Sequence, residues 1–535
     1  MEWPAGDPGI RDWLTLSTIL ALFSISIAGS IIQHTMPAGD EPAYLQAALF
    51  IRENGGVLNF IGLCFNRVYT ESNRQPIPIL ILSAFASRDP NFFFIGKVIS
   101  GAFSMAFIIA YYLIVRRRFG FAPAAISSAI MATNVALVVY SGQVTCETML
   151  TLFTTTTWYM TLKGFEDKRY FALAGLANGL AYMTKASGLL LAIPFAAACL
   201  VRYRSKALGN KWFYSYFVML LIVSSPLLAR NMLAYGNPFY HASHDVVWFD
   251  RWIEYTRLDY GYKVSFTDYL STHGPQDIIS RLACGLAVFL FNTLVQVGGF
   301  LGVVFAFFLI ASVRRQSGET KAYVITLVLV HALYFAWYTP IDADFRFELP
   351  ITPILAAYAA MGVAIGLGGE SRTVKTIAQT AVAYLSVMLV LMPLGAIFDM
   401  NGRERAGYLK PYIVPSDYKK VMDYFEKNIA EGDKLVLVDG STYSEYYWTS
   451  SKLSRLKPLL YPYRIEKAPE ILLNEQNITY MLATRGLFDM DPRMGEYLGY
   501  DNSRGLYEKK NLPGYIMVFA DENSPAQYLI YKRTG

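Results

Sequence analysis

The sequence predicts a polytopic α-helical membrane protein that carries a small α/β domain at its C-terminal end. Apolar residues make up 54% of the 535 residues, charged residues only 16%, and the mean hydropathy is +0.30. Long apolar runs recur up to residue 397, and beyond it they give way to charges, turn residues and short β-rich runs. These observations predict the fold class without any motif.

About eleven apolar runs approach the roughly 20 residues that a helix needs to cross a bilayer. They cover residues 13–33, 92–115, 121–140, 147–163, 170–187, 188–202, 212–230, 283–312, 322–338, 350–368 and 376–397. The first run lacks a small-residue cleavage site, so we expect a retained helix rather than a signal peptide.

Lys and Arg gather in short loops that all fall on one side of the predicted membrane. The positive-inside rule assigns that side to the cytoplasm. This pattern accounts for the formal net charge of +6, so no nucleic-acid partner is expected. An odd number of spans then places the N-terminus inside and the larger segments 34–91, 231–282 and 398–535 outside. We expect a multi-pass protein of the plasma (inner) membrane, divided into a membrane domain (1–397) and an extracytoplasmic domain (398–535).

Two of these outer segments have recognisable patterns. Residues 43–51 and 78–86 are apolar but too short to span, which is typical of helices lying along the membrane interface. The tail predicts a helix and four strands, and hence a small α/β domain. The helix covers 418–428, and the strands cover 434–439, 478–483, 515–520 and 527–532.

Ionisable residues gather on the outer side of the predicted spans, where burying charge is costly and function is the default reading. They are, with one amide, Asp40, Glu41, Arg67, Arg74, Glu147, Lys185, Arg230, Asn231, Asp342, Asp344 and Arg346. Carboxylates suit proton abstraction or a divalent cation, and Lys and Arg suit an anionic group such as phosphate. A lipid-linked phosphosugar would use both. The same charges also fit a polytopic transporter or flippase for a polyprenyl-linked glycan.

Eight landmarks follow one another along the chain between residues 13 and 365. They are Asp40-Glu41-Pro42-Ala43-Tyr44, Arg74-Gln75-Pro76-Ile77-Pro78, Arg116-Arg117-Arg118-Phe119-Gly120, Tyr140-Ser141-Gly142-Gln143 leading to Glu147, Thr184-Lys185, Pro226-Leu227-Leu228-Ala229-Arg230-Asn231, Tyr235-Gly236-Asn237-Pro238 and Arg346-Phe347-Glu348-Leu349-Pro350. The series resembles the type C (GT-C) glycosyltransferases that use polyprenyl-phosphate sugars, namely the protein O-mannosyltransferase family and its relative, the lipid A aminoarabinose transferase. The tail from residue 398 is not covered.

The resemblance implies an integral membrane glycosyltransferase whose site faces outward. It would transfer a monosaccharide from a polyprenyl-phosphate donor, with inversion, to an acceptor that is a protein, a lipid or a polysaccharide. Asp40 matches the essential first-loop carboxylate of the family and would be the base, with Glu41 shaping the site. Lys185 and Arg230 would contact the donor phosphate. Arg346 opens a segment like the family's Arg-Tyr-Leu-Leu-Pro pattern and would also meet phosphate.

The chain departs from the family pattern at two positions. Gln75 precedes Pro76 where relatives often have a basic residue, and Arg74 would then supply the charge from one position earlier. Glu147 stands where relatives commonly have Asp, which keeps the charge and moves it outward by one methylene. Both Arg74 and Glu147 are expected to bind substrate.

Structural alternatives exist for these residues. Asp40 before Pro42 also fits a helix N-cap, and Glu41 would complement a helix dipole. Lys185 and Arg230 would alternatively be snorkelling residues at helix ends. In a third reading the protein is a scaffold whose tail binds a partner, which leaves the intramembrane charges without a purpose.

No cofactor is assigned, and a divalent cation is the one candidate. His241, His244 and Asp245 have a spacing that could hold zinc, although loop histidines beside aromatic residues are commoner without a metal. A dense aromatic set follows, which fits membrane anchoring better than stacking on sugar rings. It consists of Trp248, Phe249, Trp252, Tyr255, Tyr260 and Tyr262.

Overall fold

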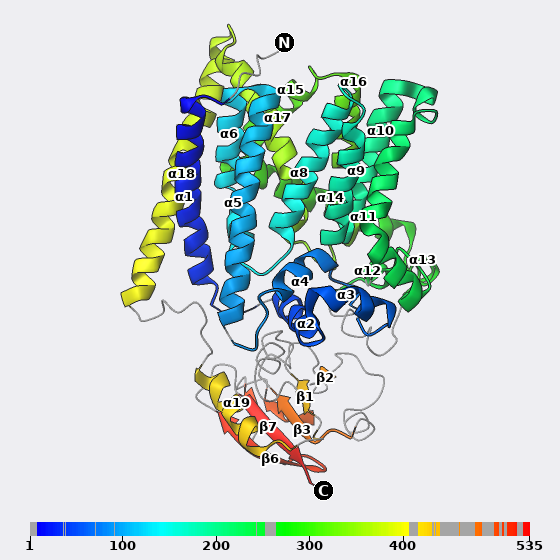
Figure 1. Cartoon of the computed structure of the whole chain (residues 1–535). Coiled ribbons are helices and arrows are strands. Elements are labelled where there is room, and N and C mark those ends of the chain that lie inside the picture. The colour runs from blue at the N-terminus through cyan, green and yellow to red at the C-terminus, as the bar shows by residue number, and fades with distance from the viewer. Residues whose placement is uncertain are drawn as a thin grey trace.

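The computed structural model shows an upright bundle of helices with a small sheet beyond one end (Figure 1). It describes residues 8–35, 37, 39–69, 71–89, 91–241, 243–251, 264–405, 416–430, 433, 435–438, 459–460, 477–483, 497–501, 506–507, 511–521 and 528–534. All statements below concern these residues.

Helices occupy all the positions where the sequence predicts a span. They are α1 (Ile10–Gln33), α5 (Asn91–Phe119), α6 (Phe121–Ala132), α7 (Val135–Ser141), α8 (Glu147–Gly164), α9 (Tyr170–Thr184), α10 (Ala192–Tyr203), α11 (Lys211–Tyr235), α14 (Pro275–Gly298), α15 (Gly302–Val313), α16 (Gly318–Tyr338), α17 (Thr352–Leu367) and α18 (Arg372–Arg405). In the described part of the chain, seven segments are long and apolar enough to cross a membrane, or eight if the bent pair α6 and α7 is one span. The number eleven therefore stays a prediction.

The predicted span 121–140 consists of two helices, α6 and α7, which meet at an angle of 61°. Asn134 causes the break. Its Oδ1 accepts the N–H of Leu137 at 2.7 Å as the N-cap of α7, and its Nδ2 donates to the carbonyl of Gln296 at 2.9 Å. A polar side chain that caps a new helix ends the previous one.

Close packing between helices depends on small residues at some crossings. Gly175 on α9 is one example, because a Cβ built there would lie 2.0 Å from the carbonyl oxygen of Tyr216 on α11. Only glycine allows two backbones to approach this closely. The main core lies between the helices and contains the edge-to-face pair of Trp158 and Tyr358, whose ring centroids are 5.9 Å apart.

The short helices of the loops gather at the end of the bundle opposite the start of α1 (Figure 1). They are α2 (Glu41–Glu53), α3 (Gly56–Phe65), α4 (Pro76–Ser83), α12 (Ser243–Val246) and α13 (Phe266–Thr272). The stretches 43–51 and 78–86, expected along the interface, form α2 and α4 and pack largely inside the protein. Helix α3, by contrast, exposes several apolar side chains, among them Val57, Leu58 and Ile61.

The tail contains α19 (Ser416–Asn428) and seven strands at the same end of the molecule as α2 to α4 (Figure 1). The strands are β1 (Leu435–Val438), β2 (Leu459–Leu460), β3 (Tyr480–Ala483), β4 (Tyr500–Asp501), β5 (Leu506–Tyr507), β6 (Tyr515–Asp521) and β7 (Tyr528–Arg533). The main sheet has the order β2-β1-β3-β7-β6, with β1 parallel to β2 and β3, and β7 antiparallel to β3 and β6. All four predicted strands and the predicted helix are present. The proposed boundary after residue 397 falls within α18, and the division into two domains stays a prediction.

Candidate active site

A pocket lies where the loop helices meet the ends of the long helices. Residues from distant parts of the chain line it. The lining comprises Asp40, Tyr44, Asn73, Arg74, Gln75, Glu147, Thr184, Lys185, Ala186, Ser187, His241, Val246, Tyr334, Phe335, Tyr338, Arg346 and Phe347. Five of the seven residues predicted for the site are in this lining. The pocket therefore combines charged side chains with aromatic ones.

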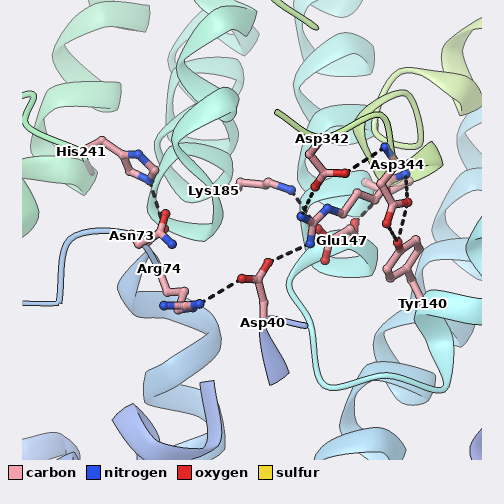
Figure 2. A network of polar contacts seen from close by, with 11 residues as sticks. Asp40, Asn73, Arg74, Tyr140, Glu147, Lys185, His241, Asp342 and Asp344 are labelled. Atoms are coloured by element: carbon pink, nitrogen blue, oxygen red, sulfur yellow. Dashed lines mark hydrogen bonds and ion pairs between the residues drawn. The ribbon is translucent and has the colours of Figure 1, made fainter. Parts of the chain in front are cut away.

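Asp40 is held between two arginines. Its Oδ1 accepts from Nη2 of Arg74 at 2.9 Å, and its Oδ2 accepts from Nη1 of Arg346 at 2.7 Å (Figure 2). Asp40 does occupy the N-cap position of α2, but its side chain makes no capping hydrogen bond there. The carboxylate is therefore turned into the pocket. Arg74 supplies the positive charge that Gln75 cannot, as the sequence suggested.

The charges around Asp40 decide its protonation. Burial by itself raises the pKa of the carboxyl, and the positive charges of Arg74, Arg346 and Lys185 lower it more strongly. The resulting pKa lies below the ordinary range of aspartate. Asp40 is therefore a carboxylate throughout the physiological pH range when no substrate is bound.

Lys185 and Glu147 form a further ion pair of the pocket. Nζ of Lys185 lies 2.8 Å from Oε1 of Glu147, and 5.3 Å from the ring centroid of Phe347. Lys185 adopts an extended backbone conformation that ends α9, and Glu147 begins α8. Because Lys185 points into the pocket rather than out along a helix end, the snorkelling alternative does not describe it (Figure 2).

Arg346 joins Asp40 to two further carboxylates of its own loop. Its Nη2 donates to Oδ2 of Asp342 at 2.7 Å, and its main-chain N–H donates to Asp344 at 3.0 Å. Both carboxylate oxygens of Asp344 lie 2.6 Å from the phenol oxygen of Tyr140 on α7 (Figure 2). This loop is a hydrogen-bonded unit that presents one guanidinium to the pocket.

Glu41 is not in the pocket lining, although the sequence prediction made it catalytic. Its Oε1 accepts the N–H of Val144 at 2.6 Å, and its Oε2 lies 2.5 Å from Nε2 of His34. The side chain is only 1% exposed. The carboxylate thus links the turn between α1 and α2 to the loop before α8. Its contacts are structural and lie outside the pocket lining.

Arg230 is likewise outside the lining, although it was expected to contact phosphate. Its Nη1 donates to the carbonyl oxygen of Glu71, and its guanidinium lies 5.7 Å from the ring centroid of Tyr69. Glu71 in turn accepts the main-chain N–H groups of Asn73 and Arg74, at 2.7 and 3.2 Å. Arg230 therefore anchors the loop that carries Arg74.

His241 contributes to the pocket in a way the sequence did not suggest. Its Nε2 lies 3.0 Å from the carbonyl oxygen of Asn73 (Figure 2), and burial, followed by the nearby His244, lowers its pKa to about 4. It is therefore a neutral imidazole at physiological pH. The sequence singled out His241 only through its spacing from His244 and Asp245, for which a metal was considered.

The zinc hypothesis for this loop gains no support from the side chains. Nowhere in the described residues do three or more His, Cys, Asp or Glu side chains form a group that could hold a metal ion. The side chain of Asp245 lies outside the described set. Both oxygens of Asp40 accept from arginines, and a divalent cation stays a candidate only.

The aromatic set of this loop packs inside the protein rather than along the membrane surface, as far as it is described. Trp248 lies edge-to-face on Trp337 of α16, with centroids 5.6 Å apart, and Phe249 is fully buried. The remaining members lie outside the described residues. They are Trp252, Tyr255, Tyr260 and Tyr262.

The chain is similar to known proteins in part of its sequence and in its fold. Residues 91–229, from α5 to α11, match the family model of the dolichyl-phosphate-mannose-protein mannosyltransferases. No curated protein sequence matches the chain.

Two solved structures are similar over almost the whole chain. One is the oligosaccharyltransferase of Archaeoglobus fulgidus tethered to an acceptor peptide, with a TM-score of 0.56 and 11% identity, covering 98% of this chain and 74% of that one. The other is ArnT from Cupriavidus metallidurans bound to undecaprenyl phosphate, with a TM-score of 0.54 and 12% identity, covering 98% of this chain and 99% of that one. The chain has the fold of the type C membrane glycosyltransferases.

Proposed function

We propose that the protein is an inverting glycosyltransferase that takes a monosaccharide from a polyprenyl-phosphate donor and transfers it to an acceptor at the pocket. The observation that carries the proposal is the carboxylate of Asp40, which is held by two arginines and faces a lysine inside a pocket of a type C fold. The family model over 91–229 and the undecaprenyl phosphate bound by the similar ArnT structure support a lipid-linked donor.

The three cations provide a place for the donor phosphate. Arg74, Lys185 and Arg346 all line the pocket, and each contacts a carboxylate. Guanidinium groups bind phosphate through paired hydrogen bonds, and an ammonium adds a compact charge. These groups would stabilise the negative charge that develops on the polyprenyl phosphate as its bond to the sugar breaks.

Binding of the phosphate would also change the basicity of Asp40. Without substrate, the cations hold its pKa low, which makes it a poor proton acceptor. A donor phosphate that draws Arg74 and Arg346 toward itself removes part of this stabilisation and raises the pKa. Asp40 would therefore become a competent base when the donor is in place.

The proposed step is a single displacement. Asp40 accepts the proton of the acceptor nucleophile, the nucleophile attacks the anomeric carbon, and the bond to the phosphate oxygen breaks. One substitution at that carbon inverts its configuration. Polyprenyl phosphate leaves as the anion paired with Lys185 and Arg346.

The orientation follows the distribution of charge along the bundle. The last turn of α5, which carries Arg116, Arg117 and Arg118, lies at the end of the bundle opposite the pocket, and the strands of the tail lie at the pocket end (Figure 1). We place the N-terminus in the cytoplasm and the pocket at the outer face of the plasma membrane. The acceptor peptide bound by the similar oligosaccharyltransferase shows one acceptor class that such a fold serves, and for this chain a protein, a lipid and a polysaccharide are all candidates.

The test is donor cleavage by the purified full-length protein in detergent. A panel of polyprenyl-phosphate monosaccharides is supplied with crude membrane acceptors, and free polyprenyl phosphate and transferred sugar are measured. The proposal expects one donor to yield both products in equal amounts. If no donor is cleaved while proteoliposomes move intact lipid-linked sugar across the bilayer, the protein is a transporter instead.

A further inference from the structure

Two buried amides on α14 contact the loop that carries Arg346. Asn292 and Gln296 are 4% and 5% exposed, in a helix that is otherwise strongly apolar. They are four residues apart, so their side chains lie on the same face of the helix. Burying two carboxamides in a membrane helix is costly unless their hydrogen bonds are satisfied.

Their hydrogen bonds go to the main chain on both sides of Asp344. Nε2 of Gln296 donates to the carbonyl of Phe345 at 2.5 Å, and Nδ2 of Asn292 lies 3.4 Å from the carbonyl of Ala343. Oε1 of Gln296 accepts from the hydroxyl of Thr352 at 3.1 Å, which fixes the orientation of the amide.

These carbonyls need partners from outside their own segment. The loop lies between α16 and α17. A carbonyl in a regular helix accepts from the N–H group one turn further along, and a carbonyl in a loop lacks that donor. Nδ2 of Asn292 also lies 3.4 Å from Oε1 of the buried Glu348 in the same loop. The amides thus contact three points of the loop.

The opposite side of the loop faces the pocket. Arg346 reaches from it to Asp40 at 2.7 Å and to Asp342 at 2.7 Å, and its side chain is 18% exposed. In the proposed mechanism the guanidinium of Arg346 binds Asp40 in the free enzyme and a phosphate in the complex. Because the side chain has to change partners, the backbone that carries it has to stay fixed. The contacts from α14 provide that fixed point.

We infer that Asn292 and Gln296 are positioning residues, which set the place of Arg346 by binding the main-chain carbonyls of Ala343 and Phe345 in the segment that leads to it. The inference rests on the proposed function for its effect on catalysis, but its structural content is independent of any donor. Neither residue touches the pocket, so both act through Arg346.

The test compares full-length variants in detergent. Gln296→Met and Asn292→Leu keep the approximate shape of each side chain and remove its amide. Thr293→Val is the matched control on the same helix, because the buried Oγ1 of Thr293 has no hydrogen-bond partner among the described residues. Each protein is treated with p-hydroxyphenylglyoxal, and modification of Arg346 is followed by mass spectrometry of its peptide.

Both amide variants are expected to speed the modification of Arg346 by about threefold or more, because the loop opens more often. Thr293→Val is expected to match the parent. If both amide variants fold and leave the modification rate unchanged, or if Thr293→Val raises it equally, the inference is wrong. Two independent amide variants guard against one that does not fold.

Turnover gives the second readout. Gln296→Met is expected to lower donor cleavage by about 10- to 100-fold, the range for a catalytic group displaced by about 1 Å. In an Arg346→Gln background the same change should have almost no further effect, since coupled residues are not additive. An equal fold-loss in both backgrounds contradicts the inference. A parent that cleaves no donor contradicts the proposed function instead, and the modification experiment still decides this inference.

Discussion

Asp40 and Arg346 are separated by 306 positions in the sequence, and their side chains meet at 2.7 Å in the pocket. The first comes from the corner after α1, and the second from the loop before α17. This contact links two distant segments of the chain at one carboxylate oxygen. The other oxygen of Asp40 is bound by Arg74, so the charge state of Asp40 depends on both arginines.

Removing one of these cations should change the pH dependence of turnover. Arg74→Gln deletes a positive charge that lowers the pKa of Asp40, so that pKa rises. A base must be deprotonated to act, and the acidic limb of the pH profile of kcat/KM therefore moves to higher pH in the variant. The measurement is donor cleavage between pH 4 and 8. Arg88→Gln, which removes an arginine paired with the exposed Glu53, is the matched control and should keep the profile of the parent.

Lys185 and Glu147 should behave as a buried pair in unfolding experiments. Lys185→Met leaves the carboxylate of Glu147, which is 2% exposed, without its counter-ion and should destabilise the protein by about 3–5 kcal/mol. Adding Glu147→Leu removes the stranded charge and should recover most of that loss, while donor cleavage stays absent. Thermal unfolding in detergent reports the first effect. A double variant that is less stable than Lys185→Met would show that the two side chains do not act as a pair.

Glu348 gives the stability a pH dependence of its own. Burial raises the pKa of its carboxyl from an ordinary value of 4.5 to about 8. Between pH 4.5 and about 8, Glu348 is protonated in the folded protein and ionised in the unfolded chain. The contribution of Glu348 to the free energy of unfolding is therefore complete below pH 4.5 and is lost as the pH rises to about 8. The parent should therefore lose thermal stability over this window relative to Glu348→Gln, by at most about 1.4 kcal/mol per pH unit. Parallel stability curves for the two proteins would contradict the assignment.

Much of the fold could be predicted because hydrophobicity sums over many residues. Every predicted span is helical, although 121–140 and 283–312 each contain two α-helices, and the four predicted strands of the tail are β1, β3, β6 and β7. The bend between α6 and α7 could not be foreseen, because one side chain, Asn134, determines it through a partner on α14. Helix α3 was missed because its apolar face is short and lies in a segment read as a loop.

The site was predicted less completely, and geometry explains the difference. Asp40 and Glu41 are adjacent, and neighbouring residues at a helix start point about 100° apart, so only one of them can face a given pocket. The sequence identified the pair but not which member faces the pocket. Arg230 was overrated for a similar reason, because its partner is a main-chain carbonyl that no sequence pattern reveals.

Asn292 and Gln296 escaped notice because two amides do not prevent an apolar run from being read as a span. Their spacing of four residues was the available signal, since amides on one face of a membrane helix need buried partners. Those partners, Ala343 and Phe345, lie beyond two further helices, α15 and α16, and contribute only backbone atoms. Contacts of this kind become visible only in three dimensions.

The most direct test of the central claim compares Asp40→Asn with the parent for both donor binding and donor cleavage. Asparagine keeps the shape of the side chain and removes its ability to accept a proton. The account predicts that Asp40→Asn binds polyprenyl phosphate at least as tightly as the parent, because its arginines are released, and cleaves the donor about 10²- to 10⁴-fold more slowly. Glu53→Gln, an exposed acid-to-amide change outside the pocket lining, should match the parent in both. A folded Asp40→Asn protein that cleaves the donor at the rate of the parent would contradict the account.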